Sequence, residues 1–215
     1  MPKLLKNCLI VFARNPVLGK VKTRIAATQD IHKALQVYKT LLDYTLNMVA
    51  ECNFIDTRLL CFAGGFPNQA LPQPPFALAQ QIPNPNLGAR MQAAFEQAFA
   101  PNNQHQRVCI IGSDCPYLTP NHLQLAFKAL LTHKAVIGPA ADGGYYLLGI
   151  NGSMPTEQLA ILFNNIPWGT AVVFEQTLLR FKQLNIKPHH LPTLADIDTW
   201  DDWIQWTGNE KEEGA

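Results

Sequence analysis

The sequence has few charged residues and almost no net charge. Charged side chains make up 15% of its 215 residues, and 17 Lys and Arg against 16 Asp and Glu leave a formal net charge of +1. A general nucleic-acid binder is expected to carry a basic excess across its whole domain, so the balance argues against DNA or RNA as a partner. The 47% of hydrophobic residues is typical of a globular protein instead.

Long hydrophobic runs and paired cysteine motifs are also missing. The first apolar run spans about six residues before Arg14, which is too short for a secretory signal or a membrane span. The five cysteines are odd in number and show no C-x-x-C spacing, and four of them lie in or beside apolar runs, where a reduced cysteine is commonly buried. We therefore expect a cytoplasmic protein without a membrane partner. The sequence does not indicate the oligomeric state.

Several catalytic motifs are absent as well. The sequence contains no G-x-G-x-x-G dinucleotide fingerprint and no G-x-S-x-G nucleophile turn. A phosphate-binding P-loop does not fit around Lys20, because Arg14 stands where glycine is required and Val21 where Ser or Thr is required. The adjacent His189 and His190 have no partner at metal-ligand spacing, which argues against a zinc site.

Short apolar runs alternate with helical patterns along the chain. We expect strands at residues 8–13, 57–63, 76–81, 107–114, 134–140, 145–150 and within 186–194. We expect helices at residues 31–49 with Asp30 as N-cap, 87–98, 120–131 after Thr119, 171–184, and a short one from 200, with a Gly/Pro-rich connection at 64–75. The alternation predicts an α/β fold with a mostly parallel sheet covered on both faces, as one domain over residues 1–207 and a polar tail at 208–215.

A basic loop follows the first expected strand. It carries Arg14, Lys20, Lys22 and Arg24, and Gly19 shapes the turn. In a parallel sheet, ligands bind beyond the carboxyl ends of the strands, where loop amides and helix N-termini favour phosphate. The pattern therefore predicts a phosphate clamp, and a solvated basic turn is the alternative.

Three aspartates follow later strands. Asp114 ends the expected strand at 107–114, and Asp196 and Asp198 are two apart, so they face the same side of an extended segment. Carboxylates in such places suit Mg²⁺ or Mn²⁺, and the ion would bridge a diphosphate. The alternatives are a turn-forming role for Asp114 and N-terminal helix charge for Asp198.

Two further segments are candidates for the wall of a sugar or acceptor pocket. Gly143 and Gly144 permit close backbone approach, while Asp142 and Tyr145 offer a carboxylate and an aromatic face. Trp168 lies on an expected loop, where its indole would stack on a ring or plug the core. A glycine hairpin without a binding role is the alternative for the first segment.

Taken in order, "FARNPVLGKVKTRIA", "NLGARM", "IGSDCPYLT", "GPAADGGYYLLGI", "IPWGT" and "DIDTWDD" resemble the bacterial glycosyltransferase-like family associated with arsenosugar biosynthesis. That family belongs to the GT-A, or nucleotide-diphospho-sugar transferase, superfamily. The resemblance covers residues 8–203. It implies a GT-A-like three-layer α/β/α sandwich and an enzyme that transfers a sugar from a nucleotide-diphospho-sugar to a small acceptor, with a divalent cation, Mg²⁺ or Mn²⁺.

The resemblance also implies roles for single residues. The basic loop would bind the phosphates, and Asp114 would bind the metal where GT-A enzymes usually carry a D-x-D motif. Since Ser113-Asp114-Cys115 holds only one acid, Asp196 or Asp198 is the candidate for the second ligand. Asp142 is the candidate for activating the acceptor.

Two other functions fit the same residues. The basic loop and "DIDTWDD" also resemble the nucleotidyltransferases of cofactor biosynthesis, which share the fold and attach a nucleotide to a phosphate or sugar phosphate with release of pyrophosphate. A non-catalytic nucleotide-binding protein of the same fold is the third reading, because one fold hosts many functions.

Overall fold

The structure is a computed structural model, and it describes residues 6–67 and 76–213. Residues 68–75, which belong to the expected connection at 64–75, and residues 214–215 of the expected polar tail lie outside the described part.

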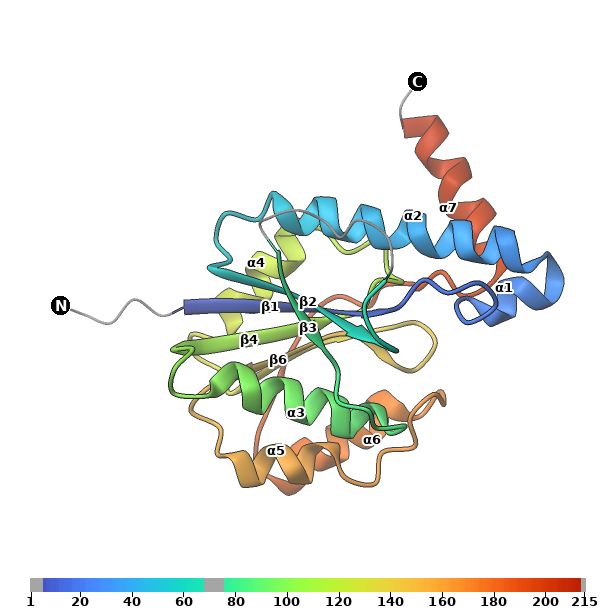
Figure 1. The fold of residues 1–215 in the computed structure, drawn as a ribbon. Helices are drawn as coiled ribbons and strands as arrows, with labels where there is room; N and C mark the ends of the chain where they lie inside the picture. The colour runs from blue at the N-terminus through green and yellow to red at the C-terminus, as the bar shows by residue number, and fades with distance from the viewer. Residues whose placement is uncertain (1–5, 68–75, 214–215) are drawn as a thin grey trace.

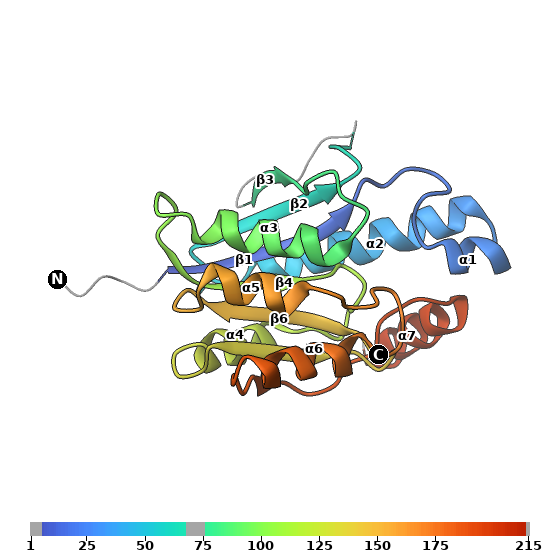
Figure 2. The same cartoon turned by 90° about the horizontal axis from the view of Figure 1, so that it is seen from below.

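The described strands form one seven-stranded sheet (Figures 1 and 2). The strands are β1 (Lys6–Arg14), β2 (Thr57–Ala63), β3 (Phe76–Gln80), β4 (His105–Ile111), β5 (Ala135–Pro139), β6 (Tyr145–Asn151) and β7 (His189–His190), in the order β3-β2-β1-β4-β6-β5-β7. β6 pairs antiparallel with β4 and β5, and the other pairs are parallel. The expected mostly parallel sheet is confirmed.

Helices cover both faces of the sheet. One face carries α2 (Ile31–Ala50) and α4 (Pro120–Ala129), and the other carries α3 (Leu87–Phe99), α5 (Thr156–Phe163) and α6 (Val173–Gln183), as Figure 1 shows above and below the sheet. At one end, α1 (Thr23–Thr28) and α7 (Trp200–Glu213) pack beside α2. The expected three layers are therefore present. α7 continues through Glu213, so the backbone of the polar tail is helical up to that residue.

Side-chain caps fix the starts of four of the five helices that the sequence predicts, and α6 is the exception. The Asp30 carboxylate accepts hydrogen bonds from the amides of His32 and Lys33, at 2.7 and 2.9 Å, and so opens α2. At α7, Thr199 and Asp202 exchange hydrogen bonds between their backbone amides and side chains, which confirms the expected capping box. α1 and α5 were not expected, and neither has a side-chain cap that would signal its start.

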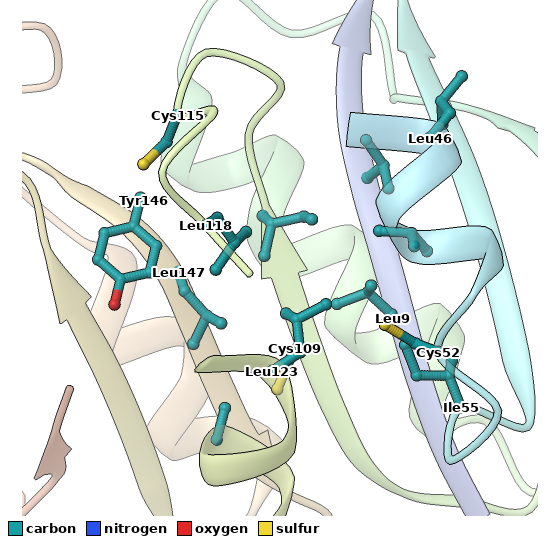
Figure 3. Packing of buried hydrophobic residues seen from close by; sticks show 14 of the residues in the cluster. Leu9, Leu46, Cys52, Ile55, Cys109, Cys115, Leu118, Leu123, Tyr146 and Leu147 are labelled. Atoms are coloured by element: carbon teal, nitrogen blue, oxygen red, sulfur yellow. The ribbon is translucent and has the colours of Figure 1, made fainter. Parts of the chain in front are cut away.

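Alternation along the central strand builds the core on both faces. Leu9 and Val11 of β1 face the layer of α2 and α4, whereas Cys8 and Ile10 face the layer of α3, α5 and α6. Figure 3 shows part of the first layer, where Leu9, Cys109 and Leu123 meet. All five cysteines are buried as free thiols, whereas the sequence predicts burial for four of them.

In the described part of the chain, no helix is both long enough and apolar enough to cross a membrane.

Candidate functional site

Two adjoining clefts open where β1 and β4 end. The first, here called the charged cleft, has a volume of about 410 Å³ and is lined by Arg14, Lys20, Lys22, Arg24, Arg90, Asp114 and Asp198 among others. The second, the aromatic cleft, has a volume of about 420 Å³ and is lined by Asp142, Gly144, Tyr145, Tyr146 and Trp168 among others. Phe12, Arg24, Leu87, Gly112 and Asp198 line both. The two clefts therefore share a wall, and one extended ligand or two small ones can meet there.

The basic loop is anchored at its start and its middle. The Tyr38 hydroxyl, which comes from α2, accepts a hydrogen bond from the Arg14 amide at 2.7 Å and donates one to the Arg14 carbonyl at 2.8 Å. Val21 is buried in the core, whereas Arg14, Lys20 and Arg24 are exposed. Lys22, the residue before α1, has a left-handed backbone with a φ of 45°, which turns the chain into the helix. The loop therefore holds a defined shape beside the charged cleft.

An ion-pair cluster joins this loop to two of the predicted aspartates. The Lys22 ammonium nitrogen lies 3.2 Å from Asp114 and 3.5 Å from Asp198, and it donates a hydrogen bond to the Ile197 carbonyl at 2.6 Å. Only 4% of the Lys22 side chain is exposed. Arg24 pairs with Asp198 at 3.0 Å. Because an ammonium has three donors, Lys22 is fully occupied by internal acceptors. The exposed Arg14 and Lys20 are the cations of the loop without a carboxylate partner among the described residues.

Asp114 lies in a loop rather than at a strand end. β4 ends at Ile111, three residues earlier than the sequence predicts, because the chain turns away from the sheet after Gly112. The Asp114 carbonyl then accepts a hydrogen bond from the Ile197 amide at 2.8 Å. This bond brings Asp114 and Asp198 to the same cleft although 84 positions separate them in the sequence.

Asp196 and Asp198 occupy different surroundings. Asp198 lines both clefts, whereas Asp196 lines neither. Burial, followed by the nearby carboxylates of Asp114, Asp142 and Asp198, raises the pKa of Asp196 to about 7. Asp196 therefore tends to stay protonated, and Asp198 is the better partner for Asp114.

The aromatic cleft contains most of the predicted acceptor-pocket residues. Asp142 is exposed, and its carboxylate accepts a hydrogen bond from the Gly144 amide at 2.8 Å, which fixes its direction. Trp168 and Tyr145 meet edge to face with ring centroids 6.3 Å apart. The indole nitrogen of Trp168 is buried without a hydrogen-bond partner in the described part of the protein. One aromatic wall and one oriented carboxylate therefore face the same space.

Two of the predicted glycines support the clefts without lining them. Gly143 has a φ of 88°, and a Cβ atom there would lie 1.9 Å from the Ala171 carbonyl oxygen. Gly19 has a φ of 74° and shapes the basic loop. Neither belongs to the lining of either cleft. Their contribution is backbone geometry, which only glycine supplies readily.

The structure adds residues that the sequence reasoning missed. Arg90 of α3 and Gln81, which follows β3, both line the charged cleft, and the Arg90 guanidinium donates a hydrogen bond to the Gln81 side-chain oxygen at 2.6 Å. Arg90 stands in the segment "NLGARM", and its position as a lone cation in the second turn of a helix beside the crevice was the available signal. Gln81 gave none.

Among residues 6–67 and 76–213, no group of three or more His, Cys, Asp or Glu side chains is arranged to hold a metal ion.

Comparisons with known proteins place this fold. The profile of a family described as an uncharacterized protein conserved in bacteria, DUF2064, matches residues 45–170. No curated protein matches the sequence significantly. A solved structure of a candidate nucleotide-diphospho-sugar transferase from Desulfovibrio desulfuricans G20 is 30% identical, with a TM-score of 0.82, and the match covers 96% of this chain and 88% of that one.

More distant structures share the fold alone. The 4-diphosphocytidyl-2C-methyl-D-erythritol synthase of Anaerococcus prevotii is 11% identical with a TM-score of 0.61, and the match covers 96% of each chain. The Mycobacterium tuberculosis protein Rv0371c, solved in complex with manganese, is 16% identical with a TM-score of 0.55, and the match covers 93% of this chain and 97% of that one. The GT-A-like fold expected from the sequence is thereby confirmed.

Proposed function

The chain belongs to the DUF2064 family within the nucleotide-diphospho-sugar transferase superfamily, and we propose that it transfers a sugar from a nucleotide-diphospho-sugar to a small hydroxyl acceptor. The observation that carries this proposal is the pair of clefts with a common wall. A cation-rich cleft suits the diphosphate of the donor, and an adjoining cleft with aromatic rings and an oriented carboxylate suits a sugar and its acceptor. A more specific proposal is that the chain belongs to the arsenosugar-type group of these transferases. No contact in either cleft is specific for arsenic.

The proposed reaction breaks the bond between the anomeric carbon and the diphosphate oxygen, and the bonding electrons stay on that oxygen. The acceptor oxygen forms the new bond to carbon and gives its proton to a base. We assign that base to Asp142, because its carboxylate lines the aromatic cleft and is held in place by the Gly144 amide. Arg14, Lys20 and Arg24 are the proposed cations that stabilise the departing diphosphate.

A divalent cation fits the residues present, with two carboxylates rather than three. Asp114 and Asp198 approach the same ammonium of Lys22, and 46% and 35% of their side chains are exposed, so both carboxylates are accessible from the charged cleft. Mg²⁺ is usually held by one or two carboxylates together with substrate phosphates, which matches this pair. Such an ion, when bound, neutralises charge on the diphosphate. The protein solved with manganese, Rv0371c, has the same fold.

Nucleotidyl transfer is the second candidate. Its support is the likeness to cytidylyltransferases, one of them a CMP:2-keto-3-deoxy-manno-octonic acid synthetase complexed with CTP, which is 10% identical with a TM-score of 0.62 and whose match covers 97% of this chain and 99% of that one. The basic loop that suits a diphosphate also suits a triphosphate. The two reactions differ in their products, because nucleotidyl transfer releases pyrophosphate and sugar transfer releases a nucleoside diphosphate.

The deciding experiment supplies the protein with Mn²⁺ and either nucleotide-sugars or nucleoside triphosphates, each with a panel of small hydroxyl and phosphate acceptors. Release of UDP or GDP from a nucleotide-sugar is the expected result. Asp142→Asn should lower the rate about 100-fold or more, as expected for loss of a general base, while UDP or GDP still binds. Pyrophosphate release from a triphosphate would establish the second candidate instead, and nucleotide binding without any turnover would indicate a non-catalytic protein.

A further inference from the structure

Arg14 and Arg90 approach the charged cleft from two different elements. Arg14 is the last residue of β1, and Arg90 lies in the second turn of α3. Neither guanidinium forms an ion pair with a carboxylate among the described residues, where the ion pairs involve Lys22 and Arg24 instead. Two guanidinium groups thus share one cleft without a counter-ion.

The charges that line the cleft also favour an anionic ligand. Five cationic side chains line it against the carboxylates of Asp114 and Asp198, and both carboxylates are already paired with Lys22 and Arg24. Burial first, and the charge of Arg14 second, lowers the pKa of Arg90, so keeping Arg90 charged in this place is unfavourable. An anionic ligand would offset that penalty.

Gln81 fixes the Arg90 side chain. The Gln81 amide nitrogen donates to the carbonyls of Ala13 and Cys61, at 3.2 and 2.9 Å, which ties Gln81 to β1 and β2. Its oxygen then accepts the hydrogen bond from Arg90 at 2.6 Å. The Nε–H of Arg90 is buried and has no partner in the described part of the chain. The guanidinium is therefore oriented in advance, with donor capacity left over.

We propose that Arg14 and Arg90 form the subsite for the phosphate groups of the nucleotide, and that Gln81 is a positioning residue for Arg90. The planar guanidinium suits phosphate because it offers two parallel N–H donors. This inference rests on the proposed function, since it takes a nucleotide as the occupant of the charged cleft. It adds Arg90 to the phosphate-binding residues and makes Lys22 an internal counter-ion of the two aspartates.

The test measures the binding of UDP, GDP, uridine and guanosine by isothermal titration in the presence of Mn²⁺. Arg90→Gln should weaken the diphosphate that the wild type binds by about tenfold or more, which is the usual effect of losing a charge-assisted hydrogen bond. Arg90→Lys should recover part of the loss, because it restores the charge without the planar fork. Arg180→Gln is the matched control, since Arg180 on α6 is half-buried like Arg90 but lines neither cleft.

The role of Gln81 is tested with a double-mutant cycle. Gln81→Met should weaken the diphosphate severalfold in the wild-type background and cause no further loss in the Arg90→Gln background, because the residue acts through Arg90. Melting curves of all variants check that they are folded. Equal losses in both backgrounds would refute the positioning role.

Two results would overturn the phosphate subsite while leaving the proposed function intact. One is a wild type that binds UDP or GDP together with an Arg90→Gln variant that binds it equally well. The other is an equal loss for the nucleoside and its diphosphate, which would mean that Arg90 contacts the base or ribose. If the wild type binds neither diphosphate, the proposed function fails, and the subsite fails with it.

Discussion

The charged cleft and the aromatic cleft share a wall but are built in different ways. In the charged cleft, side chains from loops are held by ion pairs such as Lys22 with Asp114. In the aromatic cleft, rings and backbone pack directly on glycines, as Trp168 does on Gly88 and Ala171 on Gly143. Substitutions that change charge should therefore disturb the charged cleft, and substitutions that change side-chain volume should disturb the aromatic cleft. We therefore expect the charged cleft to select by charge and the aromatic cleft to select by shape.

The largest effect is expected for Gly143→Ala beneath the aromatic cleft. The new Cβ atom would lie 1.9 Å from the Ala171 carbonyl oxygen, and the φ of 88° is strained for alanine. We expect a loss of about 4 kcal/mol in the free energy of unfolding, measured by urea denaturation, because both backbone segments must move.

Gly65→Ala is the matched control for that variant. Gly65 has a similar φ of 84°, but no atom lies within 4 Å of the place that the new methyl group would take. Its loss should be about 1–2 kcal/mol, the cost of the left-handed conformation alone. Equal losses for the two variants would show that close packing at Gly143 is unimportant.

Lys22→Met tests the charged cleft. Removing the buried ammonium leaves Asp114 and Asp198 without their shared cation and leaves the Ile197 carbonyl without its donor. We expect a loss of about 3 kcal/mol in the free energy of unfolding, at the lower end for breaking a buried pair because both carboxylates are partly exposed. Lys20→Met should change it by less than about 0.5 kcal/mol, because Lys20 is exposed. A small effect of Lys22→Met would mean that the cluster does not organise the cleft.

The sequence predicts the charged cleft better than the aromatic one. The basic loop is a local signal, because its cations are close in sequence and follow an apolar strand. Arg90 and Gln81 could not be found in that way, because their contact joins a helix and a strand end that lie far from the basic loop in the sequence. The glycine pair at 143–144 predicts a close approach, but only the packing of Ala171 shows which glycine needs it.

The same limit explains the fold prediction. Strands and long helices follow from periodicity, and the caps at Asp30 and Thr199 are short-range patterns. α1 has six residues and begins after a left-handed Lys22, and α5 has eight residues without a side-chain cap. Such short helices are stabilised by tertiary packing, as α1 is by the burial of Ile25 in the core. The local sequence alone therefore does not predict them.

Asp196→Asn, two residues from Asp198 of the charged cleft, should have a smaller effect on the free energy of unfolding, and this effect should depend on pH. The pKa of Asp196 is raised to about 7 by burial and by neighbouring carboxylates, of which Asp114 is the first, while Lys22 acts in the opposite direction. As pH rises from 4 to 7, the unfolded chain loses this proton and the folded protein keeps it, so the wild type loses stability over that window. Asparagine removes the effect.

The gain from Asp196→Asn in the free energy of unfolding should therefore grow by about 2 kcal/mol between pH 4 and pH 8, half of the ceiling of about 4 kcal/mol that the full shift implies. Urea denaturation across that range provides the measurement. Asp43→Asn serves as a control, because Asp43 lies exposed on α2, far along the chain from the cluster. A gain that does not vary with pH would contradict the raised pKa.

The smallest effect is expected for Gly88→Ala, which tests whether shape governs the aromatic cleft. A methyl group at this site would lie 2.7 Å from the Trp168 ring, so the indole must shift, while alanine itself favours the helix by about 1 kcal/mol. We expect a net loss of about 1 kcal/mol in the free energy of unfolding and a changed near-ultraviolet circular dichroism spectrum, because Trp168 also contacts Tyr145.

Trp168→Phe supplies a smaller ring that leaves room for the methyl group of Gly88→Ala. The double variant should therefore be more stable than the sum of the two single losses predicts. Strict additivity would mean that Gly88 and Trp168 do not set each other's position, and the aromatic cleft would then lack the rigid wall that distinguishes it from the charged cleft.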